Sequence, residues 1–428
     1  MLDPSRRRIA ITGLGAICAL GQQVPEVWAA MQAGQCGIAP ITGIQTNRLS
    51  AGIAAQVSGF DPAAHLGNRR APTLDRGVQL AIVAAREAMQ QAGLQPDPAQ
   101  AHRRAVILAA VIGQTSLDAE YYRFYGEGAT RAHPLTVPRI MTNGPASHLT
   151  MEFGMHGPSY AVASACASAN HAIACAADAI RLGRSDVVLT GGADASIVAG
   201  VFKCWEALRV LSADTCRPFS RDRSGLVLGE GAGILVLESW DHATRRGALI
   251  LAELAGVGMS ADGADLTAPS AAGAAAAIRA ALDDGGLDSS EIGWVNAHGT
   301  GTRLNDRTES AALHQVFTRP PPASSNKSMI GHCLSAGGAL EAVATVMALR
   351  DGVLPPTANF RESDPECDLD TIPNTARVLP IQAALSNSFA FGGLNAVLAL
   401  KAVPSVAAGG APSVAAGAAP SVAAGVAA

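Results

Sequence analysis

One cysteine and two histidines are the residues of this sequence best placed to do chemistry. Cys166 stands in a run of small side chains, SACASANHA (residues 164–172), between a strand-like segment and a helical one. A thiol at the start of a helix lies beside free backbone N–H groups, whose partial positive charge stabilises a thiolate. We therefore expect the pKa of Cys166 to be lowered. A buried structural cysteine fits the local pattern equally well.

The two histidines each follow an apolar strand, at the point where a polar turn begins. His298 lies in NAHGTGT (residues 296–302) and His332 in SSNKSMIGHC (residues 324–333). Strand ends of this kind commonly carry catalytic groups in α/β folds. Structural metal sites usually contain two ligands only a few residues apart. Because these histidines are far apart in the sequence, the pattern argues against a metal centre.

Together with Lys327, a thiolate and two imidazoles suit acyl-group chemistry. A nucleophilic cysteine can hold an acyl group as a thioester. Two neutral imidazoles that donate hydrogen bonds can stabilise the enolate that forms when a malonyl unit loses carbon dioxide. The carbanion would then attack the thioester carbonyl and form a carbon–carbon bond. Such a site needs neither a metal nor an organic cofactor.

The elements that must position these residues alternate between strands and helices, which predicts an α/β protein with buried sheets. Two pairs of segments are loosely similar and indicate a duplication. LGEGAGILVLE (228–238) is similar to FGGLNAVLALK (391–401), and AITGLGAIC (10–18) to AELAGVGMS (252–260). We expect two similar halves, residues 1–250 with the cysteine and residues 251–402 with the histidines, followed by a disordered Pro/Ala/Gly repeat tail over residues 403–428.

Composition excludes several classes of function. The 31 basic and 35 acidic residues nearly balance, unlike those of a nucleic-acid binder. Eight scattered cysteines without a CxxC pair favour reduced thiols in the cytoplasm over disulfides or a zinc site. Glycine and proline interrupt both uncharged stretches, so no membrane span is expected. GLGAIC (13–18) begins like a dinucleotide-binding motif, but Cys18 occupies the third glycine position.

Five ordered motifs give the chain a resemblance to a known family. Over residues 6–402 it resembles the β-ketoacyl-acyl-carrier-protein synthases of the I/II type, and within them the nodulation protein E branch. The resemblance implies a thiolase-like fold of two similar halves, with stacked mixed sheets in an αβαβα layered arrangement. The motifs are SACASANHA, DTCRPFSRDRSGLVLGEGAGILVLE (214–238), NAHGTGT, NKSMIGH (326–332) and NSFAFGGLN (387–395).

The resemblance also assigns roles, residue by residue. Cys166 matches the acylated nucleophile, and His298 and His332 match the pair that supports decarboxylation of a malonyl thioester. The product would be a fatty acid or polyketide-type chain longer by two carbons. The other matches are Lys327, which orders the second histidine, Glu341 as a buried supporting acid, the backbone N–H groups of Cys166 and Phe391 as the oxyanion hole, Phe391 also as the gate to the acyl pocket, Thr300 and Thr302 as pantetheine-binding residues, and Arg209 as a contact of the carrier protein.

The partner implied by the resemblance is an acyl carrier protein, which presents substrates on phosphopantetheine. Relatives are dimers, so we expect a homodimer or a heterodimer with a chain-length-factor-like subunit. An alternative is that this chain is itself a catalytically silent subunit of that kind. Such subunits lack the nucleophile, so Cys166 argues against this alternative. A thiolase would use another cysteine near its C-terminus, and Cys367 in DPECDLD does not resemble it. A non-enzymatic acyl-binding protein would not need all three reactive residues.

Two positions depart from the family pattern. The gate loop of the family usually reads GFGGTN, whereas this chain has AFGGLN, with Ala390 and Leu394 in place of glycine and threonine. A Cβ at residue 390 restricts the backbone beside the gate. Gate motion and the choice of chain length therefore stay open.

Overall fold

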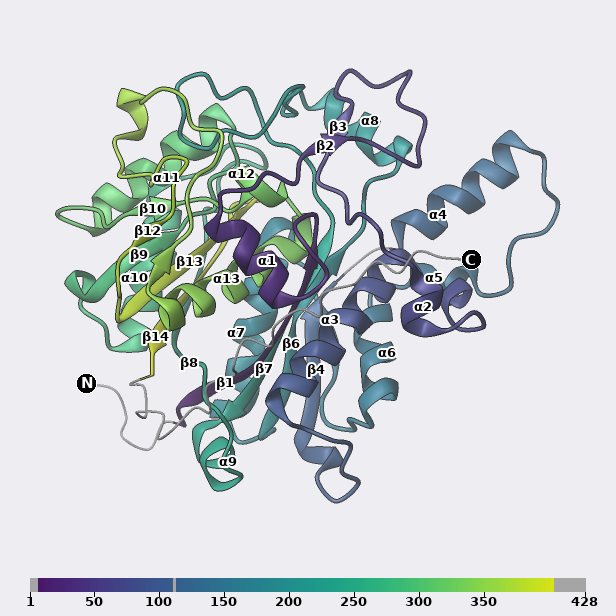
Figure 1. The fold of residues 1–428 in the computed structure, drawn as a ribbon, viewed down its shortest axis with the longest axis horizontal. Helices are drawn as coiled ribbons and strands as arrows, with labels where there is room; N and C mark the ends of the chain where they lie inside the picture. Colours follow the sequence, from purple (N-terminus) through teal and green to yellow (C-terminus); the bar gives the residue numbers. More distant parts are fainter. Residues whose placement is uncertain (1–6, 111–112, 404–428) are drawn as a thin grey trace, which may run out of the picture.

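The computed structural model describes residues 7–110 and 113–403, so all but the first residue of the predicted tail lies outside the described residues. Ten strands pair in the order β10-β9-β13-β14-β8-β1-β7-β6-β4-β5 (Figure 1). The first five along the chain are β1 (Ile9–Cys18), β4 (Arg104–Ala109), β5 (Tyr160–Val162), β6 (Val187–Asp194) and β7 (Gly231–Ser239). The second five are β8 (Ala252–Ala261), β9 (Ile292–Asn296), β10 (Ala323–Ser324), β13 (Ala383–Ala390) and β14 (Leu394–Ala402).

The two sets of five strands have the same topology. When the five strands of each set are numbered by their order along the chain, they lie side by side in the order third, second, fourth, fifth and first. The third, second and fourth strands are parallel, and the fifth is antiparallel to both its neighbours. The predicted similar halves with mixed sheets are therefore confirmed. The sheets also touch at one edge, where Ala10 and Ile11 of β1 pair with β8.

Helices form three layers around the two sheets. α7 (Ser168–Arg181) and α13 (Gly337–Asp351) lie in the middle and contact strands of both halves. α3 (Arg76–Ala92) covers the outer side of β1 and β7, and α10 (Ala271–Gly285) that of β8 and β14. This is the expected αβαβα layering. Every residue of α13 from Gly337 to Leu349 is buried, as in a helix with no face toward water.

Glycines in equivalent positions explain the similarity of the two strand motifs. A Cβ on Gly15 in β1 would lie 1.8 Å from the backbone oxygen of Ala84 in α3. A Cβ on Gly258 in β8 would lie 2.1 Å from the backbone oxygen of Ala277 in α10. The glycine motif at residues 13–18 thus allows close packing of a helix on a strand.

The remaining elements connect this frame. The segment of residues 114–141, called the protrusion below, extends away from the sheets at the right of Figure 1. Within the described residues, no helix is long and apolar enough to cross a membrane. The connecting elements are α1 (Val24–Gln32), β2 (Ala39–Pro40), β3 (Ile53–Ala54), α2 (Pro62–Leu66), α4 (Gln114–Tyr121), α5 (Thr136–Ile140), α6 (Gly144–Phe153), α8 (Ala199–Ala207), α9 (Trp240–Arg245), α11 (Arg303–Val316), α12 (Lys327–Ile330), β11 (Val353–Leu354) and β12 (Arg377–Val378).

Candidate active site

Cys166 lies on a sharp turn between β5 and the middle-layer helix α7. The single turn η4 (Ala165–Ala167) places Ala165 at φ 48°, a left-handed conformation that is strained for a residue with a Cβ. Ser168 stabilises this turn, because its Oγ donates to the backbone oxygen of Ala165 at 2.7 Å and accepts from the N–H of Ser164 at 2.8 Å. The cysteine side chain is 8% exposed and reaches the floor of a pocket.

The expected lowering of the Cys166 pKa is wrong. Burial raises the pKa of this thiol to about 11, although the positive charge of Lys327 and the backbone N–H groups of Phe391 and Cys166 act in the opposite direction. The carboxyl group of Asp194 adds to the increase. Loss of hydration therefore outweighs the favourable start of the helix. The resting sulfur is therefore a thiol.

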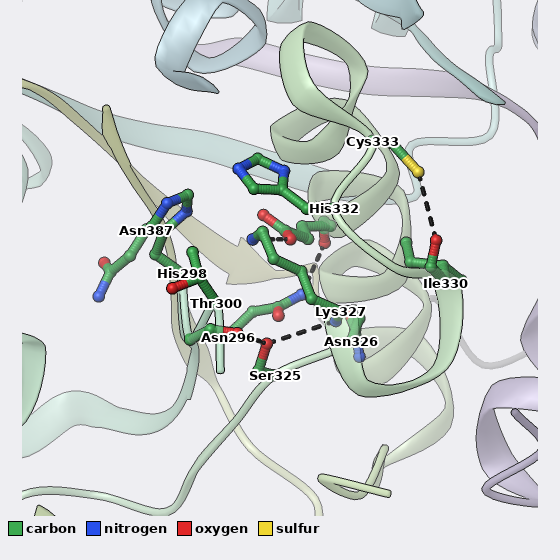
Figure 2. A network of polar contacts seen from close by, with 12 residues as sticks. Asn296, His298, Thr300, Ser325, Asn326, Lys327, Ile330, His332, Cys333 and Asn387 are labelled. Atoms are coloured by element: carbon green, nitrogen blue, oxygen red, sulfur yellow. Dashed lines mark hydrogen bonds and ion pairs between the residues drawn. The ribbon is translucent and has the colours of Figure 1, made fainter. Parts of the chain in front are cut away.

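Both histidines line the same pocket as Cys166, as predicted. Their ring centres are 5.4 Å apart and the ring planes are nearly perpendicular, at 86° (Figure 2). His298 follows β9, in a turn held by the buried Glu309, which accepts from the backbone N–H of His298 at 2.9 Å and of Gly299 at 2.7 Å. His332 precedes α13, and Figure 2 shows the neighbouring Cys333 pointing away from it, toward Ile330.

The two imidazoles are neutral at pH 7. Burial lowers the pKa of each well below its usual value, and the positive charge of Lys327 acts in the same direction. The backbone N–H of Leu334 donates to Nδ1 of His332 at 3.1 Å. Because that nitrogen accepts, the proton of His332 is on Nε2. Nδ1 of His298 has no hydrogen-bond partner within the described part of the chain.

Lys327 and Glu341 form a fully buried ion pair, and Figure 2 shows Lys327 below His332. The lysine comes from α12 and the glutamate from α13, so the pair joins the turn before His332 to the helix after it. Asn296 at the end of β9 donates to the backbone oxygen of Glu341 at 2.9 Å and to Oδ1 of Asn326 at 2.8 Å. This network connects the elements that carry the two histidines.

The pocket above the sulfur is lined by the residues predicted to contact pantetheine and to form the gate. The hydroxyl groups of Thr300 and Thr302 are 2.9 Å apart, and the Thr302 hydroxyl also accepts from the N–H of Asn305 to cap α11. Phe391 stacks on Trp205 of α8, with ring centres 6.0 Å apart and an angle of 24° between the planes. Two aromatic rings therefore lie together at one wall of this pocket.

The gate loop is a tight hairpin between β13 and β14. Gly392 and Gly393 have φ values of 87° and 66°, which favour glycine. Ala390 is the last residue of β13 and pairs with Leu394 of β14. The backbone at residue 390 is therefore part of the regular strand. Leu394 is 36% exposed.

Arg209 lies outside the pocket. It is exposed just after α8, with φ 56°, and its backbone N–H donates to the oxygen of Glu206 at 2.9 Å. The next residue, Val210, does line the pocket. The arginine therefore borders the pocket mouth and does not enter it.

Four supporting residues were missed from the sequence. Glu309 holds the His298 turn, and Asn387 donates to it at 3.0 Å. Asp306 accepts from the backbone N–H groups of Phe219 at 2.8 Å and Gly301 at 3.2 Å. Trp205 packs on Phe391. Asp306 and Glu309 lie three residues apart on the same side of α11. Two carboxylates that follow NAHGTGT so closely were the signal in the sequence that could have pointed to them.

A buried thiol and two neutral imidazoles on one pocket, between the halves of a duplicated α/β fold, define an enzyme that transfers acyl groups. The family description "Beta-ketoacyl synthase, N-terminal domain" matches residues 6–243, and "Beta-ketoacyl synthase, C-terminal domain" matches residues 251–361. The chain belongs to the β-ketoacyl synthase family. It is an acyltransferase with the thiolase-like fold of that family, and its reaction is the decarboxylative condensation that forms a β-ketoacyl chain.

Relatives from two branches cover almost the whole chain. Nodulation protein E of Rhizobium sp. (strain N33) is 49% identical over 401 residues, which are 93% of this chain and 100% of that protein. The 3-oxoacyl-[acyl-carrier-protein] synthase 2 of Staphylococcus aureus (strain COL) is 37% identical over 406 residues, 92% of this chain and 98% of that one. The ishigamide ketosynthase/chain length factor structure has a TM-score of 0.89 at 39% identity and covers 93% of this chain and 100% of its own.

Proposed function

We propose that Cys166 carries the growing acyl chain as a thioester. In the first step its sulfur attacks the carbonyl carbon of an acyl thioester, and the proton of the Cys166 thiol passes to the departing pantetheine sulfur. The negative charge that develops on the carbonyl oxygen is stabilised by the backbone N–H groups of Cys166 and Phe391. What supports this assignment is that Cys166 and Phe391 line the same pocket.

In the second step His298 and His332 stabilise the enolate of a malonyl thioester. Carbon dioxide leaves, and the enolate oxygen accepts hydrogen bonds from the two imidazoles. The new carbanion attacks the Cys166 thioester, a carbon–carbon bond forms, and the sulfur leaves with the electron pair of the broken bond. The observation that carries this proposal is that both imidazoles line the same pocket as the sulfur. Burial lowers the pKa of both rings, and a neutral imidazole keeps one N–H that it can donate to the enolate oxygen.

Lys327, Glu341 and the pocket wall support these steps. Burial lowers the pKa of both imidazoles and the charge of Lys327 acts in the same direction, while its ion pair with Glu341 fixes the turn before His332. Thr300 and Thr302 bind the pantetheine arm with their hydroxyl groups. Phe391, stacked on Trp205, is the gate between this arm and the acyl pocket.

The substrates arrive on an acyl carrier protein, and phosphopantetheine is the only prosthetic group that the reaction needs. A solved neighbour, 31% identical with a TM-score of 0.85, is described as a type II acyl-carrier protein in complex with its ketosynthase. Arg209 is exposed beside the pocket mouth, where a cation would attract an acidic carrier. The division into residues 1–250 and 251–402 falls in the connection between α9 and β8. Eight free cysteines favour the cytoplasm.

The protrusion is the surface through which this chain assembles with a second subunit. It exposes large apolar side chains, among them Tyr125 at 77% and Val137 at 66%. Contiguous exposed apolar groups of this kind mark interaction surfaces. One neighbour is described as a ketosynthase in complex with its chain length factor. The partner of this chain is either a second copy or a subunit of that kind; the other exposed members are Tyr121, Tyr122, Phe124, Leu135 and Met141.

The double variant Tyr125→Asp, Val137→Asp should therefore be monomeric. Charged side chains cannot be buried without a partner, so they oppose association more than they affect the isolated fold. In sedimentation velocity the wild type, alone or mixed with a chain-length-factor-like subunit, should behave as a dimer and the variant as a single chain. Leu249→Asp alters a leucine that is 75% exposed but lies outside the protrusion, and should keep the dimer. Dimers of the double variant would contradict the assignment.

The assignment of the histidines is tested by carbon dioxide release from malonyl-carrier. His298→Ala and His332→Ala should each lower the rate about 10²-fold to 10³-fold, because one donor to the developing oxyanion is lost. Loading of Cys166 from an acyl-carrier, measured by intact-protein mass spectrometry, should persist in both variants. Carbon dioxide release at the wild-type rate from either variant would disprove the proposed role.

A further inference from the structure

The turn that carries His332 is built like the turn that carries Cys166. Each precedes a middle-layer helix as a single turn, η4 before α7 and η6 (Leu334–Ala336) before α13. Each contains a left-handed residue at the same place, Ala165 with φ 48° and Leu334 with φ 44°. η4 packs against β13 of the other half, and η6 packs against β6 of the other half. The residue of η6 that corresponds to Cys166 is Ser335.

Ser335 is held by a buried carboxyl group at the end of β6. Its Oγ donates to Oδ2 of Asp194 at 2.8 Å and lies 3.1 Å from the backbone oxygen of Ala193, and its N–H donates to the same Oδ2 at 3.4 Å. The other oxygen, Oδ1, accepts from Oγ of Ser196 at 2.5 Å. Asp194 and Ser335 are both buried, at 6% and 7% exposure. None of the ion pairs within the described residues involves Asp194, so hydroxyl and N–H groups are its partners.

The contacts of Ser335 affect His332 through Leu334. Leu334 is next to Ser335, and its N–H is the donor that fixes the proton of His332 on Nε2. A left-handed leucine is strained and persists only where its surroundings hold it. The Ser335–Asp194 contact anchors the C-terminal side of this residue, while the pairing of His332 with Val227 and Gly229 anchors the N-terminal side.

We propose that Ser335 and Asp194 are positioning residues for His332, because their contact holds the Leu334 N–H against Nδ1 and so keeps the Nε2–H tautomer ready for the enolate oxygen. This inference rests on the role proposed for His332. It adds that the donor state of His332 depends on a carboxyl group in the other half of the chain. The same carboxyl group raises the pKa of Cys166, so it acts on both reacting groups.

The test compares two serines that donate to the same carboxyl group. Ser335→Ala removes the hydroxyl on the His332 turn, and Ser196→Ala removes the hydroxyl that comes from the loop after β6. With ¹⁵N-histidine labelling of the full chain, the His332 signals are identified by their loss in His332→Ala. The wild type should show the Nε2–H tautomer, and Ser335→Ala should show a mixture of both tautomers. Asp194→Asn should shift the same signals.

The rates of decarboxylation and of Cys166 loading give a second measurement, because a purely structural role would not change one of these rates selectively. Ser335→Ala should lower kcat of malonyl decarboxylation about tenfold with KM little changed, since a hydrogen bond to a charged group is lost. Loading of Cys166 should stay within about twofold, and Ser196→Ala should stay within about twofold in both steps. Wild-type tautomer signals in Ser335→Ala, or equal losses in the two serine variants, would overturn the proposal. Absence of decarboxylation in the wild type would instead refute the proposed function, because the tautomer signals do not depend on turnover.

Discussion

Cys166→Ala should abolish condensation, with a loss of about four orders of magnitude or more, because the described residues that line the pocket include no second thiol to hold the acyl chain. Mass spectrometry after incubation with acyl-carrier should show no covalent adduct on this variant. The fold should persist, since the change removes only a sulfur atom at a turn whose hydrogen bonds come from Ser164 and Ser168.

Cys204→Ala is the matched control for this prediction. Cys204 is exposed on α8, beside Trp205, and should leave both the adduct and the rate unchanged. An acyl adduct on Cys166→Ala, or condensation at the wild-type rate, would remove the central residue from the mechanism. The wild-type thiol should also react slowly with alkylating agents at neutral pH, because burial keeps it protonated.

Lys327→Met should have the largest effect on stability. It removes one partner of an ion pair that is fully buried and leaves the Glu341 carboxylate without its cation. Loss of one member of such a pair costs about 3–5 kcal/mol. Urea unfolding should therefore show a lowered free energy of unfolding. The double variant Lys327→Met, Glu341→Gln should recover part of it, because no unpaired charge is left.

The same substitution should change the pH dependence in a defined direction. Burial raises the pKa of Glu341, and the lysine opposes that increase, so the pKa rises further in Lys327→Met. Above the pKa of the unfolded chain, the folded variant then binds more protons than the unfolded one, and its stability falls as the pH rises. Both imidazoles lose a nearby positive charge, so their pKa values rise and the acid limb of the rate profile should move to higher pH. An unchanged acid limb would show that Lys327 does not influence the histidines.

Residues with a local signal were predictable from the sequence. The cysteine and both histidines follow strands at the start of polar turns, and that context alone separated His298 and His332 from the other histidines. Glycines at equivalent places in β1 and β8 revealed the duplication, because close packing of a helix on a strand admits no Cβ. These signals depend on neighbours within a few positions of the chain.

Properties that depend on distant parts of the chain were not predictable. The pKa of Cys166 was expected to fall from its place at a helix start, but burial in the folded chain, which the local sequence does not reveal, decides its direction. The contact between Asp194 and Ser335 joins the end of β6 to the turn before α13, in different halves. Trp205 meets Phe391 only because α8 and the β13–β14 hairpin converge on one pocket.

The crossed packing of the two turns bears on how a duplicated fold becomes asymmetric, because η4 contacts β13 and η6 contacts β6. Each half thus presents one turn to a strand of the other half. One turn holds the sulfur nucleophile, and the other holds a serine bonded to a carboxyl group. The duplication therefore supplies two similar scaffolds, of which one carries the reacting thiol and the other a hydroxyl group.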